Sequence, residues 1–397
     1  MTVLHAICWV LECLLGLPAV LACAYLTLVL IFSGRLPTPG RSSRQLRFDV
    51  IVPAHNEAVG IARTVASLRK LDWPPEQFRV VVIAHNCTDA TASRAADAGA
   101  RVLERHGSDH RGKGFALRFA FEHSRDAHWA DAVVVIDADS EASANLLEAC
   151  AARIEGGAVA IQADYGVLNP HAAWRTRLMT VAMGAFHIAR SRARERLHLS
   201  CGIRGNGWCV THKLLQQVPY GAFSLTEDIE YGIDLGMAGF RVQYAAEAEV
   251  KGEMVSNARS AQSQRLRWEQ GRFELIAQRT LPLLRAALRG RSRVCLDLAL
   301  DLMMLPLSSV AFNIVAFAIV GACDSLLAGG EPTALWVAAG CDSLLVLYVL
   351  RGWQLSGVGA RGLLDLLWAP VYVVWKAVLL LRSRSSGAWI RTEREGP

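Results

Sequence analysis

The stretch AVVVIDADS at residues 132–140 decides the fold of this 397-residue chain. Its first five residues are apolar and mostly β-branched, as in a buried strand, and the carboxylates Asp137 and Asp139 follow at once. The stretch FDVIVP at residues 48–53 has the same form and leads to Asn56 and Glu57. Because ligands bind beyond the carboxyl ends of strands in an open parallel sheet, we expect these polar residues to share one site.

Residues 48–250 alternate strand-like with helix-like runs. The predicted strands are 48–53, 79–84, 132–136, 158–163 and 241–245. The predicted helices are 58–70, 89–98, 113–124, 143–155 and 171–197. The connections have the length of right-handed crossovers, so we expect a Rossmann-like α/β domain with a mostly parallel sheet.

Long apolar segments indicate a membrane protein. The chain is 52% hydrophobic, with a mean hydropathy of +0.26. Residues 6–32, 298–327 and 334–350 approach or exceed the roughly 20 apolar residues that a spanning helix needs. Residues 363–381 are interrupted by charged residues and a proline. The first segment lacks the basic start and short apolar core of a signal peptide, which favours a retained membrane helix.

The distribution of charge predicts a topology. The net charge is +6, and arginines cluster just after the first apolar segment and just before the second. The positive-inside rule places the middle of the chain in the cytoplasm and argues against nucleic-acid binding as the reason for the charge. We expect an outer N-terminus, a hairpin with an external loop at 328–333, an interfacial segment at 363–381 and a basic cytoplasmic tail at 382–397. Ten cysteines show no zinc-ligand spacing, and a disulfide framework is not expected.

Three polar motifs suggest chemistry on a diphosphate. Asp137 and Asp139 have the spacing and hard oxygens to share Mg²⁺ or Mn²⁺ with phosphate oxygens, although a solvated turn would look the same. Asp228, in TEDIEYG, is a candidate general base or a helix cap. Lys113, in HRGKG, offers a point charge to a phosphate or is simply solvated.

Residues 262–288 read as a helix interrupted at Pro282. Arginines alternate there with Leu, Phe, Ile and Trp, a pattern typical of a helix lying in a membrane interface. Arg267 and Trp268 suit phosphate and sugar contacts, or interfacial anchoring alone.

Together the motifs resemble one family. VIVPAHNE, AHNCTDAT, RGKG, DADS, RGNGWCV, TEDIEYG and QRLRW, over about residues 45–290, resemble the membrane-embedded family 2 glycosyltransferases of GT-A fold. These include cellulose, chitin and hyaluronan synthases and bacterial exopolysaccharide transferases. The combination of DxD, TED and QxxRW is specific to the family, whereas each motif alone is common.

The resemblance implies a role for each matching residue. Donor and nucleotide contacts fall on Pro53, Asn56, Glu57, His85, Asp89, Lys113, Asp137 and Asp139, the last two with the metal. The catalytic pair of TED is Asp228, as base, and Glu227. Contacts to the acceptor or diphosphate fall on Gln264, Arg267, Trp268 and Asn206, with Gly205 and Gly207 beside Asn206. His85 replaces an acidic residue of many relatives, which weakens the case for UDP while leaving it favoured.

The implied activity is inverting transfer from a nucleotide-sugar, with UDP favoured, to a growing polysaccharide or lipid-linked acceptor at the cytoplasmic face of an inner membrane, with membrane lipids around the protein. A processive synthase, an inactive membrane scaffold and a nucleotidyltransferase are the alternatives. The expected parts are a spanning helix at 1–34, a catalytic domain at 45–260, interfacial helices at 261–294, a membrane region at 295–381 and the tail at 382–397.

Overall fold

The computed structural model describes residues 3–107, 112–254 and 258–371, with the backbone alone at residues 258–267. The chain divides into two compact units. Within the described ranges, a helical unit comprises residues 3–34, 177–193 and 303–371, and a sheet unit comprises residues 35–176 and 194–302. The candidate site lies in the sheet unit.

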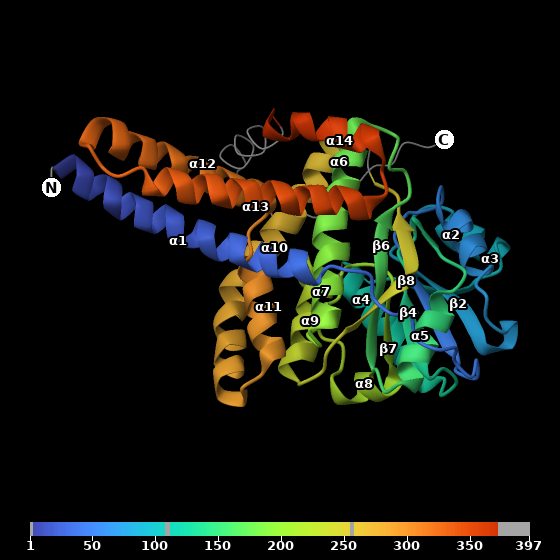
Figure 1. Ribbon diagram of the computed structural model, residues 1–397. Coiled ribbons are helices and arrows are strands. Elements are labelled where there is room, and N and C mark those ends of the chain that lie inside the picture. Colours follow the sequence, from blue (N-terminus) through green and yellow to red (C-terminus); the bar gives the residue numbers. More distant parts are fainter. Residues whose placement is uncertain (1–2, 108–111, 255–257, 372–397) are drawn as a thin grey trace. The chain divides into compact units, whose positions relative to one another are not determined.

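The sheet unit is built on a mixed sheet with the order β3-β2-β1-β4-β7-β6-β8-β5 (Figure 1). Its strands are β1 Phe48–Ala54, β2 Phe78–His85, β3 Arg101–Arg105, β4 Ala132–Val135, β5 Ser140–Ala142, β6 Ala160–Val167, β7 Trp208–Thr211 and β8 Gln243–Gly252. Four of the seven pairs formed by the described strands are parallel, and β7 is antiparallel to both of its neighbours. The expected α/β class is confirmed.

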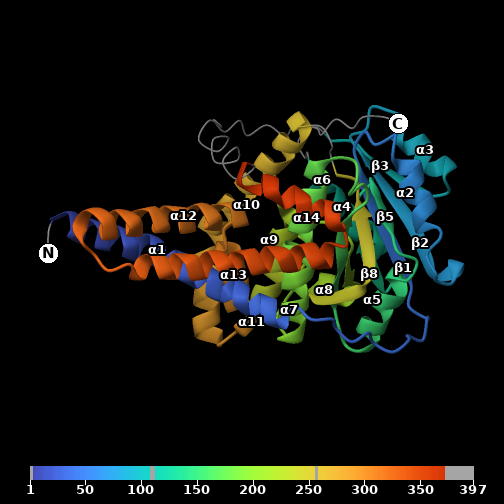
Figure 2. The same ribbon diagram turned by 45° about the horizontal axis from the view of Figure 1, so that its top comes forward.

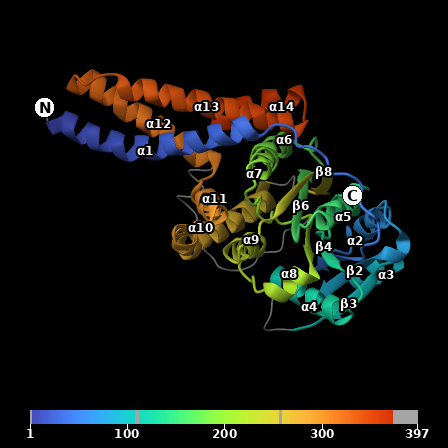
Figure 3. The ribbon, with the colours of Figure 1, turned by 60° about the horizontal axis from the view of Figure 1, so that its bottom comes forward.

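Helices cover both faces of this sheet, on opposite sides in Figure 3. The helices of the unit are α2 Ile61–Leu68, η1 Pro75–Gln77, α3 Thr91–Asp97, α4 Lys113–Asp126, α5 Leu146–Glu155, α8 His212–Gln217, α9 Glu227–Met237, α10 Ala258–Gly290 and α11 Arg293–Met303. Val50 and Val52 of β1 face α2, α3 and α5, whereas Ile51 faces α4, α8 and α9. This alternation follows from the two-residue period of a strand and explains why β1 is apolar throughout.

The predicted strands are all present, but three others were missed. β3, β5 and β7 are short, and β3 carries charged residues at both ends, so none has the apolar run that marks a buried strand. Strand β8 also continues seven residues beyond the predicted end at 245. The antiparallel β7 places the loop before it beside the end of β4.

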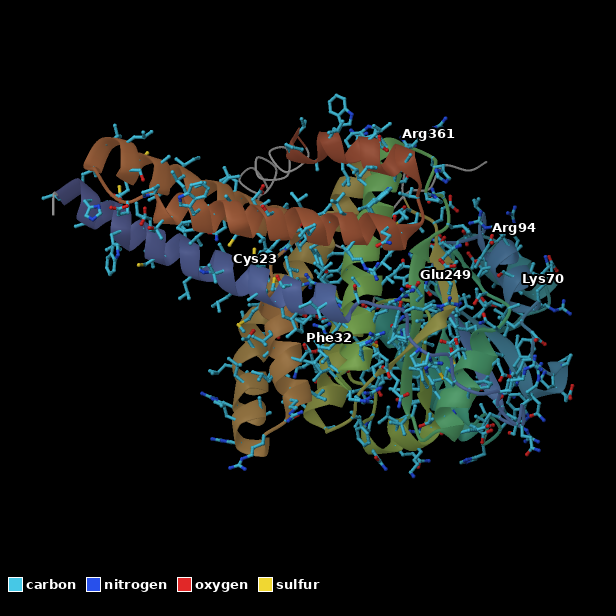
Figure 4. The ribbon with its side chains drawn as sticks, in the orientation of Figure 1. Cys23, Phe32, Lys70, Arg94, Glu249 and Arg361 are labelled. Carbon is cyan, nitrogen blue, oxygen red and sulfur yellow. The ribbon has the colours of Figure 1, made fainter. Side chains whose placement is uncertain are left out.

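The helical unit packs three long helices side by side (Figures 1 and 2). Its elements are α1 Val3–Phe32, α6 Trp174–Met183, η2 Gly184–Ala189, α7 Arg190–Arg196, α12 Leu307–Cys323, η3 Asp324–Ala328, α13 Thr333–Ser356, α14 Ala360–Asp365 and η4 Leu366–Trp368. Small residues line the contact, and Cys23 of α1, marked with Phe32 in Figure 4, donates to the Cys341 carbonyl of α13 at 3.4 Å. Tyr348 donates to the Ala185 carbonyl of η2 at 2.6 Å.

Three helices of the described chain are long and apolar enough to cross a membrane: Val3–Phe32, Leu307–Ala328 and Thr333–Ser356. The prediction of one continuous segment at 298–327 is wrong, because the chain leaves helix after Met303 and α12 begins at Leu307, with Pro306 as its N-cap. Proline suits a helix start, since no backbone N–H partner is needed there. Of the doubtful segment 363–381, residues 363–371 are helical, and the remainder with the tail lies outside the described residues.

Helix α10 runs unbroken through Pro282, so the predicted interruption there is wrong. A proline inside a helix removes one backbone hydrogen bond and costs about 3 kcal/mol. Leu283 and Ala287 are buried against α9 and α11, and this packing offsets the loss.

Candidate active site

Lys113 joins four motifs that are far apart in the sequence. Its ammonium lies 2.7 Å from Asp137 Oδ1 and 3.6 Å from Glu227 Oε1. It also donates to the Gly205 carbonyl at 2.9 Å. The residue begins α4, so the helix start fixes its position. The structure therefore brings the HRGKG, DADS, RGNG and TED motifs to one place at the carboxyl edge of the sheet.

The RGNG loop at residues 204–207 is held from beneath by Gln162 of β6. Its side chain donates to the Asn206 carbonyl at 2.6 Å and accepts from the Arg204 amide at 2.8 Å. Gly205 has a φ of +83°, and a Cβ there would lie 3.4 Å from Asp228 Oδ2. This left-handed turn favours glycine and lets the loop pass close to the candidate base.

Glu227 and Asp228 occupy the first turn of α9, where the helix dipole favours negative charge. Burial nevertheless raises the pKa of Glu227 to about 7, with Lys113 acting in the opposite direction. Burial likewise raises the pKa of Asp228 above its ordinary value, opposed by Lys113 and by a hydrogen bond from the Ile229 amide. Thr226 is the N-cap of α9, whereas Asp228, in the first turn, accepts a hydrogen bond from the Ile229 amide.

The same carboxylates shift the pKa of Lys113. Burial lowers its pKa, but the carboxylates of Asp137, Glu227 and Asp228 outweigh burial and hold the pKa of Lys113 above its ordinary value. The side chain is therefore a permanent cation at neutral pH. A permanent ammonium among carboxylates suits the binding of a phosphate group.

The predicted nucleoside residues lie at the ends of β1 and β2. Asn56 accepts from the Thr88 amide at 2.7 Å, and Asp89 accepts from the Ala58 amide at 3.2 Å, so both connect the two loops. His85 is buried, and Arg105 Nη1 of β3 lies 3.3 Å from its Nδ1. Pro53 and Glu57 are half-buried in the same region.

The acidic pair fits a hard divalent cation. Asp137 and Asp139 offer carboxylate oxygens, the ligands that Mg²⁺ prefers, and Mg²⁺ sites commonly use one or two carboxylates with phosphate oxygens and water. Among the described residues no group of three or more His, Cys, Asp or Glu side chains is placed to hold a metal ion.

The QxxRW motif lies on α10. The side chains of Gln264 and Arg267 are outside the described residues, whereas Trp268 is half-buried. Three residues further on, Gly271 packs against Thr226, the first residue of TED, because a Cβ there would lie 2.8 Å from Thr226 Cγ2. The helix of QxxRW therefore approaches the start of α9 closely.

Several side chains of the site were not found from the sequence. They are Gln162, Ser140, Arg105 and Tyr165, and the pKa of Tyr165 is raised by burial and by the charges of Asp137, Asp139 and Asp228. Ser140 donates to Asp139 Oδ1 at 2.9 Å, and its place directly after DAD is a signal that sequence reasoning could have used. The others come from strands and carry no motif of their own.

Asn206 is completely buried. It accepts from the Asp137 amide at 3.0 Å and donates to Ser140 Oγ at 2.7 Å. The structure thus places it beneath the acidic turn.

A sheet of this kind, with two acidic motifs and a lysine at its carboxyl edge, is typical of the GT-A fold of nucleotide-sugar transferases. The family described as "Glycosyltransferase like family 2" matches residues 46–271, more than half of the chain. The protein belongs to this family, and the resemblance drawn from the motifs is confirmed.

Individual relatives are distant. The chain is 22% identical to "Probable glycosyltransferase YdaM" of Bacillus subtilis (strain 168) over 250 residues, which are 60% of this chain and 59% of that protein. It is 21% identical to "Cellulose synthase 1 catalytic subunit [UDP-forming]" of Komagataeibacter xylinus over 368 residues, 87% of this chain and 46% of that protein. The chain thus spans about half the length of these curated relatives.

Among solved structures, "Mannosyltransferase PcManGT from Pyrobaculum calidifontis in complex with GDP-Man and Mn2+" matches with a TM-score of 0.58 and 17% identity. The match covers 92% of this chain and 99% of that one. At this identity the likeness establishes the fold, and the ligands in its name belong to that protein.

Proposed function

We propose that this protein transfers a sugar from a nucleoside-diphosphate sugar to an acceptor hydroxyl with inversion at the anomeric carbon. The observation that carries the proposal is the position of Lys113, which contacts Asp137, Glu227 and the Gly205 carbonyl at once. A cation that contacts Asp137 of the acidic pair and Glu227, the neighbour of the candidate base Asp228, supports a site where a diphosphate leaving group and an attacking hydroxyl would meet.

In the proposed reaction, Asp228 accepts the proton of the acceptor hydroxyl as its oxygen attacks the anomeric carbon. The new glycosidic bond forms as the bond to the diphosphate breaks, and the nucleoside diphosphate leaves with the electron pair. A donor with an α linkage gives a β-glycoside. Electrostatic stabilisation of such developing charge is usually the largest catalytic contribution.

The residues at the site divide this work. Lys113 would neutralise the charge that develops on the leaving diphosphate. Asp137 and Asp139 would hold Mg²⁺ or Mn²⁺, which supplies further positive charge to the diphosphate. Asn56, His85 and Asp89 would bound the nucleoside pocket, and Trp268, with Gln264 and Arg267, would cover the diphosphate and acceptor.

We further propose that the catalytic domain works at the cytoplasmic face of an inner membrane. Three described helices could span it, and much of their outer surface exposes large apolar side chains such as Trp9, Leu14 and Trp336. Arginines flank these helices on the side of the sheet unit in sequence. The acceptor would be a growing polysaccharide or a lipid-linked saccharide.

Nucleotide release from purified protein tests the proposal. The full chain in detergent would be assayed with Mn²⁺ against a panel of UDP- and GDP-sugars, with Asp228→Asn as the inactive control. Release that requires a particular sugar and Asp228 supports transfer. No release from any donor with any saccharide or lipid-linked acceptor favours the inactive scaffold.

A processive synthase is the second candidate. Product size separates it from single transfer: long polymer from donor, metal and membranes supports the synthase, and a product longer by one sugar supports single transfer. Three candidate spanning helices in the described chain would form only a narrow bundle for a polymer channel.

A further inference from the structure

The acidic turn at residues 137–140 is fixed by hydrogen bonds on every side. The Asp137 amide donates to Asn206 Oδ1 at 3.0 Å, and the Ser140 amide donates to the Asp137 carbonyl at 3.2 Å. Thr64 donates to the Ala138 carbonyl at 2.8 Å. The backbone that carries both carboxylates therefore has little freedom.

One chain of hydrogen bonds reaches the carboxylate of Asp139. Asn206 Nδ2 donates to Ser140 Oγ at 2.7 Å, and Ser140 donates in turn to Asp139 Oδ1 at 2.9 Å. The side chains of Asn206 and Ser140 are completely buried, so water does not compete for these bonds. Asn206 thus holds Asp137 through its amide and Asp139 through the serine hydroxyl.

The same asparagine is itself held in place. Gln162, also buried, donates to its carbonyl at 2.6 Å. The next residue back is Gly205, whose carbonyl accepts from Lys113. A single loop consequently sets the positions of both carboxylates and of the lysine relative to one another.

We propose that Asn206 and Ser140 are positioning residues that orient Asp137 and Asp139 for a divalent cation bound with the donor diphosphate. This rests on the proposed function and replaces the acceptor or diphosphate contact that the resemblance implies for Asn206. The two side chains act through the carboxylates and do not touch the sugar. Residues that orient metal ligands typically change metal affinity 10–100-fold when they are replaced.

The test is the binding of Mn²⁺ to the full chain, measured without turnover. Purified protein in detergent is titrated with Mn²⁺ in the presence of UDP, or of GDP if a GDP-sugar is the donor, and bound Mn²⁺ is followed by electron paramagnetic resonance. Ser140→Ala removes one hydroxyl and should fold. Ser140→Thr keeps the hydroxyl, and Asn206→Ala removes both bonds to the turn.

Ser67→Ala is the matched control. Ser67 is half-buried and accepts from the Ala142 amide at 3.2 Å, so the change removes a similar bond near the same strand without touching the acidic turn. We expect the half-saturating Mn²⁺ concentration to rise about tenfold in Ser140→Ala and at least as much in Asn206→Ala. Ser140→Thr and Ser67→Ala should stay near wild type.

The turnover number at saturating Mn²⁺ should fall less than about threefold in Ser140→Ala, because the base is untouched. An unchanged Mn²⁺ half-saturation in Ser140→Ala overturns the inference. A loss of turnover with unchanged metal dependence also overturns it, since that is a general structural effect. Wild-type protein that binds neither nucleotide with Mn²⁺ overturns the proposed function as well, so the two failures are distinct.

Discussion

The two ends of the central strands carry acidic side chains in opposite electrostatic situations. At the amino end of β1, Asp49 is almost completely buried, and Arg79 donates to both of its oxygens at 2.7 and 2.8 Å. Ser124 donates to the same carboxylate at 2.6 Å. At the carboxyl end, three carboxylates share the ammonium of Lys113.

The difference separates stability from function. A carboxylate whose oxygens all have donors is inert, and breaking such a pair mainly costs folding free energy. A surplus of buried negative charge is unfavourable in the isolated protein and becomes favourable when a cation and substrate arrive. Perturbed carboxylates in this arrangement are typical of functional sites. Substitutions at the two ends should therefore change different measurements.

The largest effect is expected for Asp228→Asn. The amide cannot accept the acceptor's proton, so turnover should fall roughly 10²–10⁴-fold while donor affinity changes little. Donor binding and turnover are measured separately. Asp234→Asn is the control, because Asp234 lies on the same helix and pairs with Arg279 at 3.2 Å. Turnover of Asp228→Asn within a few-fold of wild type would show that another residue is the base.

Asp49→Asn should affect stability instead. It leaves the guanidinium of Arg79 without its carboxylate. Breaking a fully buried ion pair costs about 3–5 kcal/mol, and because Arg79 is 27% exposed we expect about 2 kcal/mol. The unfolding midpoint in detergent should fall by several degrees, with turnover of the folded protein unchanged. Asp72→Asn, in an exposed pair with Arg44, should change little. A large loss of turnover in Asp49→Asn would contradict the idea that the amino end of the strands serves stability and the carboxyl end serves function.

The polar residues at the carboxyl end could be singled out from the sequence because each follows an apolar strand or opens a helix. Asp137 and Asp139 come after five buried residues, and Lys113 and Asp228 stand at helix starts. Such local patterns need no knowledge of distant contacts. They were enough to name the α/β fold and to single out the carboxylates that the structure brings close to Lys113.

The ion pair at the amino end of β1 and the side chains that hold the site in place could not be predicted in this way. The partners Asp49 and Arg79 lie on neighbouring parallel strands, and the register that pairs them depends on the whole sheet. Gln162 and Asn206 meet only because β6 and β7 are antiparallel neighbours, and β7 is too short to stand out in the sequence. Long-range pairing, not composition, determines these contacts.

Gly271→Ala tests whether α10 must approach the carboxyl end closely. The added methyl would collide with Thr226, directly before Glu227, and push the helix of QxxRW away from α9. We expect turnover to fall about tenfold, since small misplacements in an active site are costly. Gly290→Ala, at the end of the same helix with nothing within 4 Å, is the control and should be neutral or slightly stabilising. Equal activity of the two variants would show that the approach is not needed.

The smallest effect is the pH dependence of stability at the carboxyl end. The pKa of Glu227 is raised by burial from an ordinary value of 4.5 to about 7, so the folded protein binds this proton more tightly than the unfolded chain. The stability that this proton contributes is complete below about pH 4.5 and is lost as the pH rises through about 7. Glu227→Gln has no such proton to lose.

The free energy of unfolding of Glu227→Gln minus that of wild type should therefore be larger above pH 7 than at pH 5. We expect a difference of roughly 2 kcal/mol, which is what a rise in the pKa of Glu227 from 4.5 to about 7 gives between pH 5 and pH 8. Unfolding midpoints of both proteins at pH 5 and pH 8, in a chelator that removes divalent cations, give the measurement. Glu122→Gln, in the exposed pair with Arg118, is the control and should show no pH-dependent difference. A difference between Glu227→Gln and wild type that is the same at both pH values would mean that Glu227 is ionised without penalty, and the carboxyl end would then resemble the amino end.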